Sequence, residues 1–341
     1  MSLVLKDMLG TGEYRLMQAG VMNPKADAEE LYMHLMGVDK TRIFMDRDKP
    51  VDIEIRKQYF ELIDRRKKRE PLQYIVGTQN FMGMDFIVNE KVLIPRPETE
   101  QVVERALKII LNKKKSIDER RDERDFIGRI SPRRIWKVLD LCCGCGAIGV
   151  TVAKRCMTAR VTATDISKEA IVTAEKNAAK FRAKVEFYCG DVFEPVRKKS
   201  YDIIISNPPY IKSYMIPVLQ EEIKTFEPLS ALDGGEDGLD FYRCIISEAP
   251  AHLKRRGVLI METGHDQGHE TKVLVEKNVA YSQCISEPVL VMRPSGKITT
   301  GWPVSTSLTI CFMASGLVDS TIKCGTKRSM KRKNGRAAIC E

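Results

Sequence analysis

The chain has 341 residues, 43% of them hydrophobic and 30% charged, which is typical of a globular protein with about two domains. Its formal net charge is +10, but seven of the basic residues lie between 323 and 336, so the remaining chain lacks the charge excess of a nucleic-acid-binding body. There is no apolar run long enough for a transmembrane helix and no secretory signal, so we expect a cytoplasmic protein with reduced cysteines and no membrane partner.

The first 70 residues are expected to form a small helical domain. Apolar residues recur at helical spacing over 28–36 and again over 55–63. From 71 to 97 the pattern changes to short aromatic and β-branched runs broken by glycines, which predicts a β-hairpin linking two domains. Helical spacing resumes over 98–111. The densely charged stretch 113–134 is expected to be a solvated surface insertion.

Predicted strands and helices alternate between 137 and 263. The strands are expected at 138–140, 161–165, 185–188, 201–206 and 258–262, and the first two helices at 148–156 and 168–181. The run at 201–206 is almost wholly apolar, as in a strand covered on both faces. This alternation predicts an α/β fold with a doubly wound, mostly parallel sheet.

A glycine-rich loop follows the first of these strands. It has the pattern G-x-G-x-x-G, formed by Gly144, Gly146 and Gly149, and Asp165 ends the next strand, where an acid can meet a ribose hydroxyl. A dinucleotide and S-adenosylmethionine both fit this pattern. Asp140 before the loop and Asp191 after the third strand favour S-adenosylmethionine, because carboxylates attract its sulfonium and ammonium but repel a pyrophosphate. Each acid alone could equally be a helix cap or a turn residue.

The cysteines at 142, 143 and 145 have a spacing that invites comparison with a metal site. Zinc sites usually need two separated ligand pairs, and no second cysteine pair or histidine pair follows here. We therefore expect no metal.

The tetrapeptide Asn207-Pro208-Pro209-Tyr210 follows the fourth strand, at the edge where ligands bind in open α/β sheets. The nitrogen of an amide or an aminopurine is a poor nucleophile, and it needs acceptors that hold its N–H groups and turn its lone pair toward a methyl group. Asn207 offers a side-chain carbonyl, and Pro208 a backbone carbonyl with no competing N–H. Pro209 stiffens the turn, and Tyr210 offers a flat face to a planar group.

With these motifs the chain resembles the release-factor glutamine methyltransferases, the HemK/PrmC family, over about residues 25 to 270. The resemblance is carried by REPLQYIVG from Arg69, FMGMDFIVNEKVLIPRPETE from Phe81, the loop at Asp140, ATDIS ending at Ser167, GDVFEP from Gly190, SNPPY from Ser206 and EPLSALDGGEDGLDFYR from Glu227.

The resemblance implies a helical substrate-recognition domain (1–70), a hairpin linker (71–97) and a class I methyltransferase domain (98–283) acting on the glutamine of the Gly-Gly-Gln motif in peptide chain release factors. The implied cofactor-binding residues are Asp140, Cys142, Gly144, Gly146, Asp165, Asp191, Val192 and Asn207. The implied substrate-binding residues are Asn207, Pro208, Pro209 and Tyr210 together with Arg96, Pro97 and Glu98.

The chain departs from the family pattern at two places. Cys142 stands where the family usually has glycine. From about residue 284 the sequence loses its periodicity, and a one-base shift of one possible codon series for 293–297 would encode the family's Asp-Arg-Val-Val. We therefore hypothesise that 284–341 is an aberrant, frameshifted or disordered basic tail, with the last strands of the sheet missing.

Three other functions are compatible with the motifs. An adenine-N6 methyltransferase would present the same nitrogen geometry, but it would need a basic groove to hold its nucleic acid. A related enzyme could methylate a glutamine of a ribosomal protein. A non-catalytic cofactor-binding or interaction module would bind the cofactor without turnover.

Overall fold

The computed structural model describes residues 3–118, 134–288 and 306–313. The chain divides into two compact units. The first unit comprises residues 1–94 and 214–232, and the second comprises 95–213 and 233–341. Each unit is described by itself.

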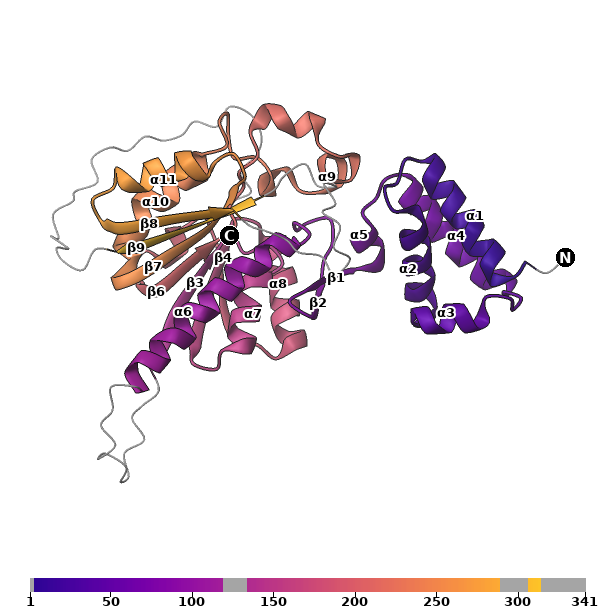
Figure 1. Cartoon of the computed structure of the whole chain (residues 1–341), viewed down its shortest axis with the longest axis horizontal. Helices are drawn as coiled ribbons and strands as arrows, with labels where there is room; N and C mark the ends of the chain where they lie inside the picture. Colours follow the sequence, from indigo (N-terminus) through magenta and orange to yellow (C-terminus); the bar gives the residue numbers. More distant parts are fainter. Residues whose placement is uncertain (1–2, 119–133, 289–305, 314–341) are drawn as a thin grey trace, which may run out of the picture. The chain divides into compact units, whose positions relative to one another are not determined.

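The first unit is a helical bundle, as predicted for the first 70 residues (Figure 1). Its main helices are α1 (Leu5–Gln18), α2 (Pro24–Met36), α3 (Lys40–Asp46) and α4 (Ile53–Lys67). Asp39 and Asp52 cap α3 and α4, because their carboxylates accept hydrogen bonds from backbone N–H groups of the first turn. Tyr59 of α4 is fully buried, and a Cβ at Gly12 of α1 would overlap its hydroxyl, so the two helices approach closely.

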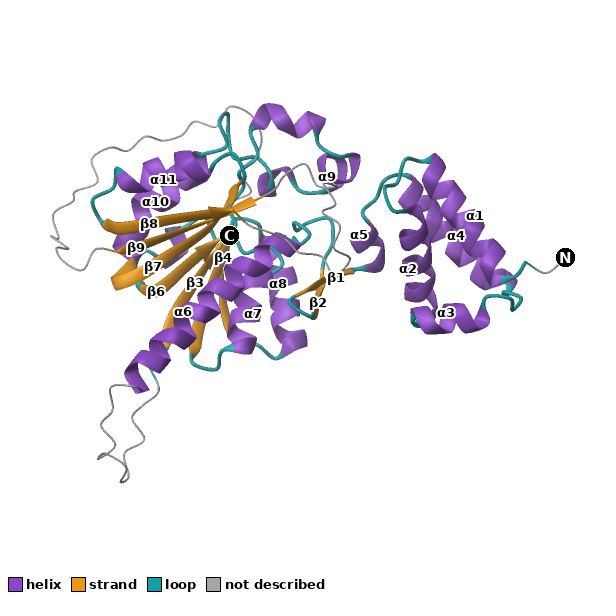
Figure 2. Cartoon of the chain, viewed as in Figure 1, coloured by secondary structure: helices purple, strands orange, loops and turns teal. Residues whose placement is uncertain are grey.

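The predicted hairpin is present. The short helix α5 (Leu72–Val76) leads into β1 (Thr78–Phe81) and β2 (Met84–Ile87), which pair antiparallel (Figure 2). The hairpin and the turn and loop residues that follow it to Ile94 belong to the first compact unit.

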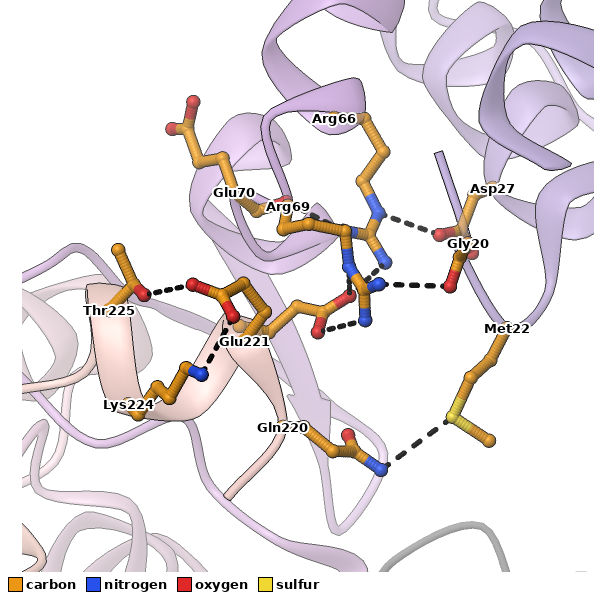
Figure 3. A network of polar contacts seen from close by, with 11 residues as sticks. Gly20, Met22, Asp27, Arg66, Arg69, Glu70, Gln220, Glu221, Lys224 and Thr225 are labelled. Atoms are coloured by element: carbon orange, nitrogen blue, oxygen red, sulfur yellow. Dashed lines mark hydrogen bonds and ion pairs between the residues drawn. The ribbon is translucent and has the colours of Figure 1, made fainter. Parts of the chain in front are cut away.

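A segment distant in sequence completes the first unit. Residues 214–232 were expected in the methyltransferase domain, but they cluster with the helical bundle. They contain η4 (Ser213–Val218), α9 (Glu221–Phe226) and η5 (Leu229–Ala231). Figure 3 shows the polar network that holds α9 against the bundle. The half-buried Glu222 carboxylate accepts two hydrogen bonds from Arg69, at 2.7 and 2.6 Å, and one from Arg66 at 3.0 Å. Arg66 also donates to Asp27 at 2.8 Å.

The second unit is built on a sheet of seven strands in the order β5-β4-β3-β6-β7-β9-β8. The strands are β3 (Trp136–Leu141), β4 (Ala159–Asp165), β5 (Val185–Cys189), β6 (Tyr201–Ser206), β7 (Leu253–Gly264), β8 (Tyr281–Pro288) and β9 (Thr306–Met313). The five strands from β5 to β7 are parallel, and β9 is antiparallel to both of its neighbours. The prediction of a doubly wound, mostly parallel sheet is therefore confirmed.

Helices cover both faces of this sheet, with α6, α7 and α8 on one face and α10 and α11 on the other (Figure 1). Their bounds are α6 (Glu100–Asp118), α7 (Ala147–Arg155), α8 (Lys168–Phe181), α10 (Asp240–His252) and α11 (Gly268–Glu276), and the short η1 (Pro97–Thr99) and η3 (Glu194–Val196) lie in the loops. Since α6 runs to Asp118, the start of the predicted insertion 113–134 is helical, and 119–133 lies outside the described residues. Within the described ranges, no helix combines the length and apolarity needed to cross a bilayer.

The sheet corrects our prediction that its last strands are missing and that a tail begins at 284. Strands β8 and β9 fall largely inside that segment, and β9 pairs with β7 along seven residues of each strand. The physical reason is burial: the side chains of 308–311 are almost fully buried, and β9 covers an edge of β7 that would otherwise be unpaired. The 293–297 stretch and the basic 323–336 stretch lie outside the described residues, and the frameshift stays a hypothesis.

The Glu222 network generates a stability prediction. Burial raises the pKa of Glu222, but the hydrogen bonds from Arg69 and Arg66 outweigh this effect and hold it below its usual range. Removing the carboxylate leaves the buried Arg66 and the largely buried Arg69 with fewer acceptors. We expect Glu222→Ala to lower the free energy of unfolding of the first unit by about 2–4 kcal/mol.

Far-UV circular dichroism during urea unfolding is the suitable measurement, because neither tryptophan of the chain, Trp136 or Trp302, belongs to the first unit. Glu221→Ala is the matched control. The exposed Glu221 pairs with Lys224 on the helix surface, so its loss should lower the free energy of unfolding far less than the loss of Glu222. Equal effects of the two substitutions would contradict a specific role for Glu222.

Candidate active site

The predicted site residues of the second unit meet at the carboxyl edge of the parallel strands. The loops after β3, β4, β5 and β6 leave the sheet there side by side. Hydrogen bonds join each loop to its neighbour: Gly190 N–H donates to the Asp165 carbonyl at 2.9 Å, and Thr164 Oγ1 donates to the Val192 carbonyl at 3.1 Å. Ser206 Oγ donates to the Leu141 carbonyl at 3.1 Å. The edge is therefore one connected surface.

Asp165 organises the glycine-rich loop. One carboxylate oxygen accepts a hydrogen bond from Gly144 N–H at 2.8 Å, and the other accepts from Ser167 N–H at 2.9 Å. Ser167 in turn caps α8 by accepting from Ala170 N–H. Burial raises the pKa of Asp165 in spite of its backbone hydrogen bonds. Asp165 thus has a local structural role of the kind left open by the sequence, and each oxygen retains a lone pair for a ligand.

Asp140 is the most deeply buried of the three acids. Its side chain is fully enclosed, and Oδ2 accepts a hydrogen bond from Gly149 N–H at 2.8 Å. The third glycine of the loop is needed here, since a Cβ at 149 would lie 2.9 Å from Oδ2. Oδ1 has no hydrogen-bond partner within the described part of the chain. Burial raises the pKa of Asp140 to about 7. An enclosed carboxylate with a free oxygen suits a cationic ligand nearby.

The remaining loop residues leave room beside these acids. Gly144 has a φ of +53°, and a Cβ there would meet nothing within 4 Å, so the loop borders open space at this point. Gly146 also has positive φ and packs against α8. Asp191 is exposed, whereas Val192 is buried with a φ of +41°. The loops after β3, β4 and β5, here called the cradle, thus carry three carboxylates around the open space at Gly144. Their negative charge suits an adenosyl ligand that carries positive charge.

The tetrapeptide is held by three residues that were not predicted from the sequence as site residues. Asn207 Nδ2 donates to Thr99 Oγ1 at 3.2 Å, and Thr99 Oγ1 donates to Glu262 Oε2 at 2.6 Å. The Tyr210 hydroxyl points to the other oxygen of Glu262, at 3.4 Å. Pro208 and Pro209 are buried, and the side-chain amide of Gln267 donates to the Tyr210 carbonyl at 2.9 Å. The turn is therefore fixed from several sides.

Arg96, Pro97 and Glu98 lie immediately before Thr99, in and beside the turn η1. Pro97 is exposed, while Arg96 and Glu98 are half-buried. Both charges act on the buried Glu262, whose pKa Glu98 raises and Arg96 lowers. The structure thus brings these three residues to the tetrapeptide's surroundings, and the turn presents Thr99 to Asn207.

Cys142 occupies a left-handed backbone position, with a φ of +58°. This conformation costs a residue with a Cβ roughly 1–2 kcal/mol, which explains why glycine suits the position. Burial and the charge of Asp165 raise the pKa of Cys142, so its side chain is a neutral thiol. Among the described residues no cluster of His, Cys, Asp and Glu could hold a metal ion.

We expect Cys142→Gly to raise the free energy of unfolding by about 0.5–1 kcal/mol, because glycine removes the left-handed penalty but adds entropy to the unfolded chain. Thermal unfolding of the purified protein measures this change. Cys142→Ala is the matched control, since it removes the sulfur and keeps the Cβ. If both variants shift the melting temperature equally, backbone strain is not the cause.

Comparison with known proteins agrees with this geometry. Residues 7–77 match the family described as the PrmC N-terminal domain, and residues 126–223 match the methyltransferase small domain. The chain is 38% identical over 271 residues to the release factor glutamine methyltransferase of Geobacter sulfurreducens, covering 80% of this chain and 87% of the relative. It is 38% identical over 255 residues to that of Clostridium acetobutylicum, covering 73% of this chain and 82% of the relative. The enzyme of the same name from Bacillus subtilis is 37% identical over 252 residues, covering 73% of this chain and 82% of the relative.

The relatives are similar to this chain over most of their length, and the two domain matches and the order of strands in the sheet agree with them. The chain therefore belongs to the release factor glutamine methyltransferase family, and its second unit has the class I methyltransferase fold.

Proposed function

We propose that the protein transfers a methyl group from S-adenosylmethionine to the side-chain amide nitrogen of the glutamine in the Gly-Gly-Gln motif of peptide chain release factors. The observation that carries the proposal is the orientation of Asn207 in a chain that belongs to this family. Its Nδ2 is committed to Thr99. Within the described residues its Oδ1 accepts no hydrogen bond, so it is available as an acceptor for a substrate N–H group.

The tetrapeptide supplies the groups that an amide substrate needs. The lone pair of an amide nitrogen is delocalised, so the nitrogen must be held with its face toward the methyl donor. Asn207 Oδ1 and the Pro208 carbonyl would accept the two N–H hydrogens, and the ring of Tyr210 would pack on the planar amide. Since these groups position the nitrogen and do not deprotonate it, the rate gain would come mainly from orientation.

The cofactor would lie along the loops after β3, β4 and β5. Asp165 would bind its ribose, Asp191 and Val192 would lie by its adenine, and Gly144 and Gly146 would line its methionine end. Asp140 and Cys142 would border the same cradle. When bound, S-adenosylmethionine supplies an electrophilic methyl group.

The helical first unit would recognise the release factor, and Arg96, Pro97 and Glu98 would contribute to the floor of the substrate site. The other substrates that the sequence left open, adenine in a nucleic acid and a ribosomal-protein glutamine, have no comparable support. The relatives that cover most of the chain are named for release factors.

The direct test is methyl transfer from labelled S-adenosylmethionine to a purified release factor. We expect label on the wild-type factor and none when the glutamine of its Gly-Gly-Gln motif is replaced by alanine. Asn207→Ala should lower kcat by about 10²-fold or more, because the substrate nitrogen loses an oriented acceptor. Asn278→Ala, which removes an amide side chain between α11 and β8, is the control and should retain activity. Label on the alanine factor would contradict the proposed target.

The raised pKa of Asp140 gives a pH-dependence prediction. The pKa of Asp140 in the folded protein, about 7, lies above the ordinary value of an aspartic acid, about 4. The ligand-free folded protein therefore binds the proton more tightly than the unfolded chain does, and it loses stability as pH rises between about 4 and 7. Binding of cationic S-adenosylmethionine has the opposite dependence, because it favours the ionised carboxylate. The Kd of the wild type should therefore fall about fivefold or more from pH 6 to pH 7.5.

Isothermal titration calorimetry measures this change, with Asp140→Asn as the comparison. Asparagine keeps the acceptor for Gly149 N–H but carries no charge. The Kd of Asp140→Asn for S-adenosylmethionine should be higher than that of the wild type and nearly independent of pH. The melting temperature of the ligand-free variant should no longer decline between about pH 4 and pH 7. A wild-type Kd that is flat with pH would refute the pairing of Asp140 with the cofactor's charge.

A further inference from the structure

Glu262 is a buried acid whose hydrogen bonds serve the tetrapeptide. It lies in β7, beside β6, and the parallel register of Ser206 with Met261 brings it alongside Asn207. Its side chain has no exposed surface. Burying a carboxylate costs several kcal/mol unless strong hydrogen bonds offset the cost. Here one oxygen accepts from Thr99 and the other from Tyr210.

The ionisation of Glu262 determines which group donates in each hydrogen bond of the series Asn207–Thr99–Glu262. An ionised carboxylate can only accept, so the single O–H of Thr99 must donate to Glu262, at 2.6 Å. The Thr99 oxygen is then left only with lone pairs for Asn207, and the amide of Asn207 must turn its NH₂ group toward it, at 3.2 Å. The carbonyl oxygen of Asn207 is consequently directed away from Thr99.

Tyr210 is tied to the same carboxylate. Burial and the charge of Glu262 raise the pKa of Tyr210 well above its usual range, so its hydroxyl remains protonated and can donate. The first and last residues of the tetrapeptide, Asn207 through Thr99 and Tyr210 directly, thus share one anchor.

We propose that Glu262 and Thr99 are positioning residues that fix the amide of Asn207 with its oxygen toward the substrate and hold Tyr210 in register with it. This inference rests on the proposed function, since a substrate amide that offers N–H groups needs an acceptor at Asn207. If Glu262 were protonated, it could donate to Thr99, Thr99 could donate to Asn207 Oδ1, and the amide could turn over. Asn207 would then present N–H groups to the N–H groups of the substrate.

The surroundings of Glu262 make that protonation accessible. Burial raises its pKa to about 7, and the hydrogen bond from Thr99 opposes the rise. The charged and titratable groups that act on it are Arg96 just before η1, Glu98 within η1, Tyr210 after β6 and Tyr242 of α10. The Tyr242 hydroxyl donates to the backbone carbonyl of Glu262 at 3.1 Å, which fixes the strand at this point.

The test compares Thr99→Val with Thr99→Ser in the full-length protein, with labelled S-adenosylmethionine and purified release factor. Valine has the shape of threonine without the hydroxyl, whereas serine keeps the hydroxyl. We expect Thr99→Val to lower kcat by about 10²-fold, with KM for the release factor and Kd for S-adenosylmethionine changed less than about threefold. Thr99→Ser should stay within about threefold of the wild type.

The pH profile at saturating cofactor separates this role from a structural one. Wild-type kcat should fall as pH decreases through about 7, and the residual kcat of Thr99→Val should lack this limb, because its link between Glu262 and Asn207 is broken. Glu262→Gln gives a second measure if Thr99→Val unfolds: it too should lose kcat at all pH values and show no such limb.

The outcomes are distinguishable. A wild-type enzyme that labels the release factor, together with equal kcat for the valine and serine variants, overturns the positioning role and leaves the proposed function intact. A loss confined to KM or to cofactor Kd also overturns it. A wild-type protein that binds cofactor but does not label the release factor overturns the proposed function, and the inference with it.

Discussion

The carboxylate of Glu262 is fully buried, and the hydrogen-bond donors that it requires come from residues that contact or belong to the tetrapeptide after β6. An enclosed acid must find hydrogen bonds inside the protein, and here both oxygens find them in groups that hold Asn207 or belong to Tyr210. Because the buried carboxylate of Glu262 must be hydrogen-bonded, it fixes the hydroxyl of Thr99 as a donor. That hydroxyl in turn fixes the orientation of the uncharged Asn207 amide, which could otherwise adopt several rotamers.

The cofactor edge of the sheet uses the same physics with a different outcome. At Asp165 both oxygens are occupied by backbone N–H groups, so the acid shapes the loop. At Asp140 one oxygen has no such partner among the described residues, and burial raises its pKa. Asp165 thus stabilises the conformation of the loop, whereas Asp140 gives the cradle an electrostatic preference for a positively charged ligand.

The sequence pattern predicted those helices and strands that are determined by residues close together in the chain. The mostly apolar run 201–206 is strand β6 with the predicted bounds, and α8 begins after its capping residue Ser167 and ends at Phe181 as expected. Strand β7 is longer than predicted because Lys254, Arg255 and Arg256 do not look like a buried strand. Thr99 and Glu262 were missed because their partnership spans 163 positions and leaves no spacing in the sequence. The attachment of 214–232 to the first unit was missed for the same reason, since it depends on Glu222 meeting two distant arginines. The left-handed backbone at Cys142 was not predicted because a residue with a Cβ rarely adopts this conformation.

The position of β9 has a consequence for how the protein matures on the ribosome. Strand β9 lies between β7 and β8, so the sheet closes only after residues 306–313 have been synthesised and inserted. Until then β7, the strand that carries Glu262, has an unpaired edge, and the tetrapeptide's anchor is not enclosed. The nascent chain therefore contains every predicted site residue before it contains β9, the strand that covers the edge of β7 beside Glu262.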